Sequence, residues 1–279
     1  MDKSAAFKTI ASQVTEGELA FPTTAQLALK VRRALEDSEC PTSTVIQLVR
    51  AEPLLSARVV AIANSVAFNS SGREVTDVGV AVSRIGFNTV KSLAMALVTR
   101  QMAGRPATKI QQDMAHKLWE HTAHVAALAH AIASHSDDQD PETALFAGIV
   151  HEIGGFYLIS RADDFPGVLD GDFTLWINSG EAKVSRAVLN VLSVPESVKT
   201  AMEGFWEGYM ATPSASLSDI LLLAEALAPI PSPLHRLADY GDTEFSLPSI
   251  EMAIGKDTLT HILEESAEAV ASLTEALRF

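Results

Sequence analysis

The spacing of the apolar residues constrains the fold of this chain most, because they recur at intervals of three and four almost throughout. Such intervals gather apolar side chains on one face of an α-helix, whereas a half-buried strand alternates with a period of two. Val75 to Val82 does alternate, but helical spacing resumes through Val90 and Leu97, with a break at Gly86. The sequence therefore predicts an all-α fold without a parallel sheet.

Helix-start residues divide this pattern into separate helices. Asp140-Pro141 combines an N-cap residue with a proline at the first helical position, and Ser216 to Asp219 has the spacing of a capping box. We expect helices over residues 2–17, 107–136, 180–193, 195–207, 215–228 and 257–278, and further helices beginning near Pro22, Pro41, Pro53 and Pro141.

Gly104-Arg105-Pro106 is the clearest internal boundary, since glycine can end one helix and proline can begin the next. It divides the chain into an N-terminal helical lobe, residues 1–104, and a C-terminal helical lobe, residues 105–279. A chain of 279 residues, 47% of them hydrophobic, can bury a full core without disulfides. Its single cysteine, Cys40, is expected to be a half-buried loop residue.

Charge and hydropathy exclude several classes of partner. The chain has 35 acidic and 21 basic residues, a formal net charge of -14, which repels nucleic acid. The N-terminus has no basic region followed by an apolar one, and the apolar stretch from Ile220 to Ile230 is too short to span a bilayer. We therefore expect a cytoplasmic protein that binds neither nucleic acid nor a membrane.

A few histidines and acids interrupt the apolar helix faces. His121 and His124 lie three positions apart, near His116, and such a pair is either a metal pair or two surface histidines. A buried Glu152, next to His151, would cost several kcal/mol unless it were paired or bound to a cation. Glu152 could instead point to solvent from the helix edge, and the pattern leaves both possibilities open.

Glu225 is a similar anomaly, a single acid in an apolar helix, for which an exposed position is the alternative. The basic pair Arg32-Arg33 is expected to lie on a solvated helix face. The chain has no glycine-rich phosphate loop, no Gly-x-Ser-x-Gly elbow and no Cys-x-x-Cys pair. Nucleotide binding of the usual kinds and serine hydrolysis therefore have no support in the sequence.

Several motifs in order resemble the HDOD domain of bacterial signalling proteins. Glu52-Pro53-Leu54-Leu55 leads into Asn64-Ser65, as the family's Asp-Pro-x-Leu leads into Asn-Ser-Ala. Next come Ala81 to Gly86, for the family's Ala-Ile-x-x-Leu-Gly, and then Trp119-x-His121-Thr122. The run from Gly148 to Gly155 is similar to the family's Gly-Leu-Leu-His-Asp-Ile-Gly-Lys. The resemblance covers about residues 20–228 and implies a helical lobe packed on an HD-like helical lobe.

The HDOD family is related to HD-type metal-dependent phosphohydrolases, in which a His, a His-Asp pair and a later Asp bind a divalent metal that activates water. Carried over by position, the resemblance implies a site at His121, His151, Glu152 and Glu225. Both aspartates are glutamates here, which displaces each carboxylate by one methylene, roughly 1.5 Å. Glutamate remains a competent metal ligand, but a displaced carboxylate changes the position from which a metal-bound water would attack the phosphoester.

Three other positions depart from the family pattern. Gly155 replaces the family's lysine, Glu181 lies where a histidine is common, and Gly204-Phe205-Trp206 lies where the family often has two histidines. These departures weaken a site for two metal ions. The resemblance thus implies a remnant that holds one divalent transition metal or none, and no other cofactor is expected.

Two functions follow from the resemblance. The favoured one is a stand-alone HDOD protein that acts as a noncatalytic regulatory module in signal transduction, its acidic surface binding a basic patch on a protein partner. The alternative is an HD-type phosphohydrolase that acts on a phosphoester or a cyclic nucleotide. We favour the first because a family resemblance determines a fold better than a chemistry. Trp176, Phe205 and Tyr209 are expected to complete the core rather than to mark the contact surface.

Overall fold

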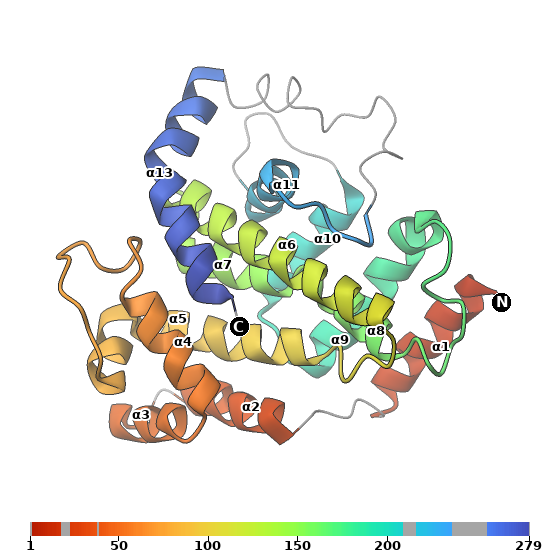
Figure 1. Ribbon diagram of the computed structural model, residues 1–279, viewed down its shortest axis with the longest axis horizontal. Helices are drawn as coiled ribbons and strands as arrows, with labels where there is room; N and C mark the ends of the chain where they lie inside the picture. The colour runs from red at the N-terminus through yellow and green to blue at the C-terminus, as the bar shows by residue number, and fades with distance from the viewer. Residues whose placement is uncertain (1, 18–22, 38, 209–215, 236–255, 279) are drawn as a thin grey trace.

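The chain is described by a computed structural model over residues 2–17, 23–37, 39–208, 216–235 and 256–278 (Figure 1). These residues form helices and loops and include no strand, so the predicted all-α fold is confirmed. The helices are α1 (Lys3–Thr15), α2 (Thr23–Glu36), α3 (Thr42–Arg50), α4 (Pro53–Ala63), α5 (Val78–Gln101), α6 (Lys109–Ser134), α7 (Pro141–Val150), α8 (Ile153–Ser160), η1 (Trp176–Gly180, a π-helical turn), α9 (Glu181–Val191), α10 (Glu196–Glu207), α11 (Leu217–Leu227) and α13 (Lys256–Leu277).

Local sequence accounts for most of the helix ends. The side chain of Asp140 accepts a hydrogen bond from the backbone N–H of Thr143, as the N-cap signal predicts. Ser216 and Asp219 form the predicted capping box at the start of α11. The break at Gly86 is also present: this residue has φ 77° and ψ 169° inside α5, a conformation open in practice only to glycine.

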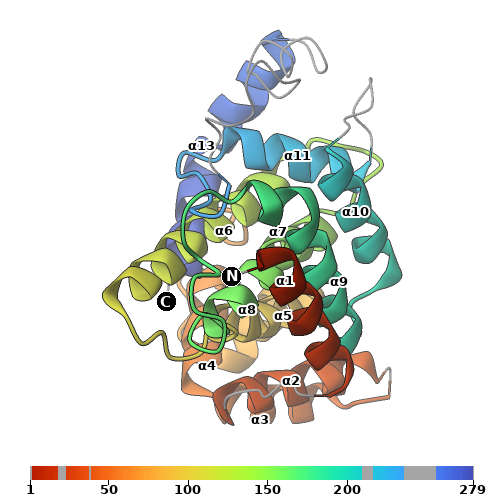
Figure 2. The same ribbon diagram turned by 90° about the vertical axis from the view of Figure 1, so that its right-hand side faces the viewer.

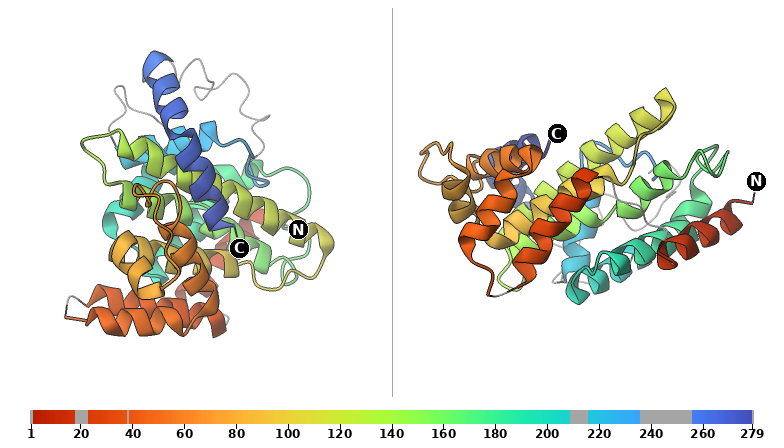
Figure 3. Two further views of the ribbon diagram at one scale, coloured as in Figure 1. Left: turned by 60° about the vertical axis from the view of Figure 1, so that its left-hand side comes forward. Right: turned by 90° about the horizontal axis from the view of Figure 1, so that it is seen from below.

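Helices α6 and α7 lie at the centre of the molecule and pack against each other (Figures 1 and 2). On one side α7 packs against α5, which in turn packs against α2 and α4. On the other side α11 packs against α6 and α10, while α1 lies along α9 (Figure 3, right). The core is continuous through these layers and contains Phe7, Leu93, Leu118, Phe156 and Trp176.

Gly148 permits the close approach of α6 and α7. A Cβ atom at this position would lie 2.5 Å from the Cα atom of Ala126, which is backbone that cannot rotate away. The same approach brings His121, on α6, near His151, directly after α7. The absence of a side chain at Gly148 therefore allows the two histidines of the candidate site to meet.

Helix α13 crosses α6 and α4 (Figure 3, left), and its last turn is hydrogen-bonded to both. The indole N–H of Trp119 donates to the carbonyl of Leu277 at 3.2 Å, and the guanidinium of Arg58 donates to the carbonyl of Ala276 at 3.3 Å. Carbonyls in the last turn of a helix have no partner within the helix, so these two donors satisfy groups that would otherwise need water.

The apolar run that opens at Pro141 divides into two helices. Helix α7 ends at Val150 and α8 begins at Ile153, so His151 and Glu152 lie at the junction rather than along one continuous face. The stretch Pro141–Ser160 is long and apolar enough to cross a membrane, but 89% of its most apolar window is buried inside the fold. This stretch is part of the protein core.

Two expectations about individual side chains were wrong or lie outside the described residues. Arg32 is buried and donates to the carbonyl of Leu192, at the end of α9, whereas Arg33 is exposed as expected. Trp176 and Phe205 are core residues, but Tyr209 lies outside the described residues. Cys40 is half-buried in the loop before α3, as expected.

Candidate metal centre

His121 and His151 face each other in the protein interior, with their Nε2 atoms 3.2 Å apart and both residues fully buried. The Nδ1 atom of His121 lies 2.7 Å from the carbonyl of Ile230, and that of His151 lies 2.6 Å from the carbonyl of Gly148. A carbonyl only accepts, so both Nδ1 atoms carry a proton. The Nε2 atoms are therefore the ring atoms left to face the shared space between the two rings, as in metal-ligating histidines whose other nitrogen bonds to a carbonyl.

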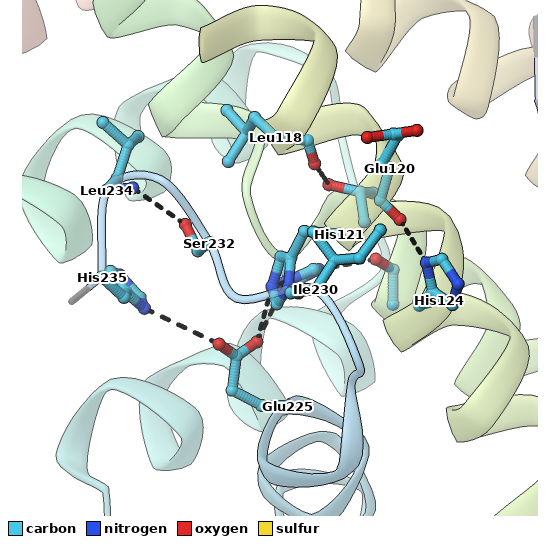
Figure 4. Close-up of polar contacts among 12 residues, drawn as sticks. Leu118, Glu120, His121, His124, Glu225, Ile230, Ser232, Leu234 and His235 are labelled. Atoms are coloured by element: carbon cyan, nitrogen blue, oxygen red, sulfur yellow. Dashed lines mark hydrogen bonds and ion pairs between the residues drawn. The ribbon is translucent and has the colours of Figure 1, made fainter. Parts of the chain in front are cut away.

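Glu225 approaches this pair from α11, and Figure 4 shows its carboxylate directed at His121. Its Oε2 atom lies 2.9 Å from Nε2 of His121 and 3.4 Å from Nε2 of His151, and its side chain is only 16% exposed. Burial acts to raise the pKa of the Glu225 carboxyl, but the charge of His121 and hydrogen bonds from both histidines hold that pKa well below its ordinary range. Glu225 is therefore an ionised partner of the two imidazoles.

The pKa of His121 is shifted in the direction opposite to that of Glu225. Burial acts to lower its pKa, but the charge and the hydrogen bond of Glu225 outweigh burial and raise the pKa above its ordinary value.

His116 and His124 lie outside this cluster: the His116 side chain is exposed, and His124 bonds to the carbonyl of Glu120, 2.7 Å away on its own helix. The spacing of the three histidines thus did not define the site.

Glu152 is fully buried at the α7–α8 junction, so the alternative in which it points to solvent is wrong. Neither carboxylate oxygen has a hydrogen-bond partner among the described residues. A buried carboxylate in this state costs several kcal/mol unless a cation or a proton compensates it. Ligand atoms of His121, His151 and Glu152 lie within 4.8 Å of one another, close enough to hold one metal ion.

Two further residues of the cluster were missed as ligands in the sequence. Glu181 begins α9 directly after the π-helical turn, and His235 follows α11 in the segment 228–235, which we call the strap. Nε2 of His235 lies 2.8 Å from Oε2 of Glu181, and its Nδ1 lies 3.9 Å from Oε1 of Glu225. Both residues are buried, and the strap carries no motif that would have indicated His235.

The charges of this second group are strongly coupled. Burial acts to lower the pKa of His235, but the negative charges of Glu181, Glu152 and Glu225 raise it to about 10. Burial raises the pKa of the Glu181 carboxyl, and the charge of His235 only partly offsets that shift. In the metal-free chain the His235 imidazolium is the cation that compensates these buried carboxylates.

The strap covers the cluster and fills the space beside Gly155. A Cβ atom on Gly155 would lie 2.6 Å from Cδ1 of Leu234 and 2.9 Å from Oε2 of Glu152. The lysine of the family pattern therefore has no room here. Phe205, where the family often has a histidine, is buried with its ring edge-on to His151, the ring centroids 5.8 Å apart.

The residues present fit a divalent transition metal. Three imidazoles and three carboxylates form a nitrogen and oxygen ligand set of the kind that suits zinc, iron, nickel or manganese. Carried over from the resemblance, the ion would be held by His121, His151, Glu152 and Glu225, and the two oxygens of Glu152 that lack a hydrogen-bond partner among the described residues are the observation that favours a cation there. When bound, such an ion would polarise a phosphoryl oxygen or lower the pKa of water.

Comparison with known proteins gives a family and a fold. The HDOD domain model matches residues 21–169. No protein of curated function matches this chain.

Solved structures of similar architecture include a candidate metal-dependent phosphohydrolase from Shewanella amazonensis SB2B, with 17% identity, a TM-score of 0.72 and 99% of each chain covered. An HDOD domain protein of unknown function from Geobacter sulfurreducens has 19% identity, a TM-score of 0.63 and 98% of each chain covered. A candidate signal transduction protein from Marinobacter aquaeolei VT8 has 18% identity and a TM-score of 0.60, over 99% of this chain and 66% of that one. At these identities the likeness establishes the fold alone.

Proposed function

Because this chain belongs to the HDOD family, we propose that it is a noncatalytic regulatory module that acts through contacts with a protein partner. The observation that carries the proposal is the closed cover over the polar cluster. His121, His151 and Glu152 are fully buried, and the strap occupies the space next to Gly155. A catalytic metal site keeps one coordination position open for water or substrate. Burial of the cluster beneath the strap argues against such an open position here.

The substitutions in the cluster support the same conclusion. A phosphohydrolase needs cationic groups that hold the phosphate, but the family's lysine is replaced by Gly155, where even a Cβ atom would meet Leu234. Phe205 adds an apolar ring against His151 rather than a further ligand. The cluster retains residues that can hold an ion, while the features around it favour a structural or regulatory use of that ion.

The charge of the chain favours a basic partner surface. A net charge of -14 attracts positively charged patches and speeds their association, and this attraction weakens as salt screens it. We therefore expect the tagged chain to capture a protein partner from a bacterial lysate at low salt and to lose it at high salt. A partner retained equally at 1 M salt would contradict the electrostatic part of the proposal.

Hydrolysis is tested directly on protein loaded with manganese, iron, nickel or zinc. Turnover of a generic phosphodiester and of cyclic nucleotides is compared between the wild type and a His151→Ala, Glu152→Ala double variant, with metal content measured by plasma mass spectrometry. We expect equal background rates in the two proteins. Turnover that the double variant loses would overturn the noncatalytic proposal and establish the phosphohydrolase alternative, which the retained ligand set favours.

A further inference from the structure

We infer that Glu152, Glu181 and His235 form a site for a divalent first-row transition metal ion, which ties the strap to α9 and to the α7–α8 junction. The three residues come from separate elements, and their ligand atoms lie within 4.8 Å of one another. The inference goes beyond the proposed regulatory function, because it concerns what holds the strap closed.

The buried oxygens of these residues provide the first evidence. Both oxygens of Glu152 and Oε1 of Glu181 lack a hydrogen-bond partner among the described residues. His235 bonds to the other oxygen of Glu181. Its imidazole is thus the one donor beside three buried carboxylate oxygens that have no hydrogen-bond partner among the described residues. Buried acceptors in native proteins are almost always satisfied, so buried oxygens without a protein partner point to a bound ion or water.

The chemistry of the three ligand residues provides the second piece of evidence. Imidazole nitrogen and carboxylate oxygen are both ligand types that zinc, manganese and iron accept in proteins. The site is buried, which strengthens the attraction between a divalent ion and the two carboxylates. A divalent ion also compensates the buried negative charge without relying on a single imidazolium.

The position of His235 decides what the ion would do. This residue lies on the strap, beyond residues 21–169 that the family model matches, and Figure 4 shows it reaching the cluster from the side opposite His121. An ion bound to His235 and Glu181 links the strap to α9 directly. Closure of the strap over His121, whose Nδ1 bonds to the carbonyl of Ile230 in the same segment, then depends on the ion.

The first measurement counts bound ions. The whole chain is stripped with chelator and dialysed against MnCl₂, and manganese per chain is measured by plasma mass spectrometry for the wild type, Glu181→Gln and His235→Gln. We expect each variant to bind one equivalent less than the wild type. Glu203→Gln, which removes an exposed carboxylate paired with Arg186, is the matched control and should bind as much as the wild type.

The second measurement follows the strap itself in the wild-type chain, so it does not depend on whether a variant folds. Amide hydrogen exchange of residues 228–235 is compared with and without MnCl₂. At a concentration ten times the dissociation constant, we expect exchange to slow about tenfold in the wild type. No change is expected in His235→Gln where circular dichroism shows that variant to be folded.

Three outcomes would overturn the inference. They are a wild-type chain that binds no manganese, variants that bind as much as the wild type, and strap exchange that manganese leaves unchanged. Manganese retained by both variants would place the ion at the other site, formed by His121, His151, Glu152 and Glu225, and not on the strap. None of these outcomes bears on the hydrolysis and partner experiments, so failure here and failure of the proposed function are distinguishable.

Discussion

Nε2 of His235 lies 2.8 Å from Oε2 of Glu181, and this buried ion pair joins the strap to the first turn of α9. The two residues are 54 positions apart in sequence. The pair therefore connects two segments that have no local reason to meet, and its strength determines how firmly the strap covers the cluster.

The stability of the metal-free protein should depend on pH through this pair. The pKa of His235 is raised from 6.5 to about 10 in the folded chain, so its stabilisation is complete below pH 6.5 and is lost as the pH rises through 10. Urea denaturation in chelator should show a free energy of unfolding that falls by at least about 1 kcal/mol over this window. His235→Gln should reduce that fall.

His261→Gln is the control for this experiment, because His261 pairs with Glu265 on the surface, where both side chains are exposed. The variant should keep the wild-type pH dependence. Equal pH dependence in His235→Gln and the wild type would mean that the buried pair does not hold its proton as described.

Gly155→Ala should destabilise the protein by about 1 to 3 kcal/mol, since the added Cβ meets Leu234 and Glu152. Leu234→Ala should also destabilise it, by about 2 to 5 kcal/mol, because Leu234 is fully buried. The double variant should be less destabilised than the sum, as the smaller residue 234 makes room for the added methyl group. Additive free energies of unfolding in denaturation experiments would show that the two residues are not in contact.

Gly148→Ala should separate α6 from α7, because the added Cβ would lie 2.5 Å from the Cα of Ala126. We expect a loss of about 1 to 3 kcal/mol in the free energy of unfolding, and a larger loss for Gly148→Val. Both variants should also bind metal more weakly, as the distance between His121 and His151 grows. Wild-type stability in Gly148→Val would contradict this account of the close approach.

Arg32→Leu should destabilise the protein by about 1 to 3 kcal/mol, because it leaves the buried carbonyl of Leu192 without its donor. Arg33→Leu offers a matched control on the adjacent exposed position, where we expect a change within about 0.5 kcal/mol. Thermal denaturation of the two variants side by side tests the contrast. Equal effects would mean that the contact between α2 and the end of α9 is not stabilising.

Much of the fold could be predicted from local sequence, because helix periodicity and capping residues act within a few positions. The capping box at Ser216, the start at Pro141 and the break at Gly86 are of this kind. Arg32 could not be placed in the same way: periodicity orients a residue on its own helix, but the carbonyl that Arg32 reaches belongs to α9.

The candidate site was predictable in part. The resemblance identified His121 and His151 from their motifs, and the structure brings them together. The sequence could not decide whether Glu152 points inwards. Neighbouring helical positions differ in direction by about 100°, and this rule no longer applies where the helix ends. His235 left no signal at all, because its partner Glu181 is found only through the tertiary fold.

The hydrogen bonds at the end of α13 have a consequence for the order in which the protein folds. Trp119, two residues before His121 on α6, and Arg58 on α4 both donate to carbonyls of residues 276 and 277. These contacts join segments more than 150 residues apart. During synthesis the central helices therefore leave the ribosome well before α13 exists to complete their packing, and the native core closes only after residue 277 has been made.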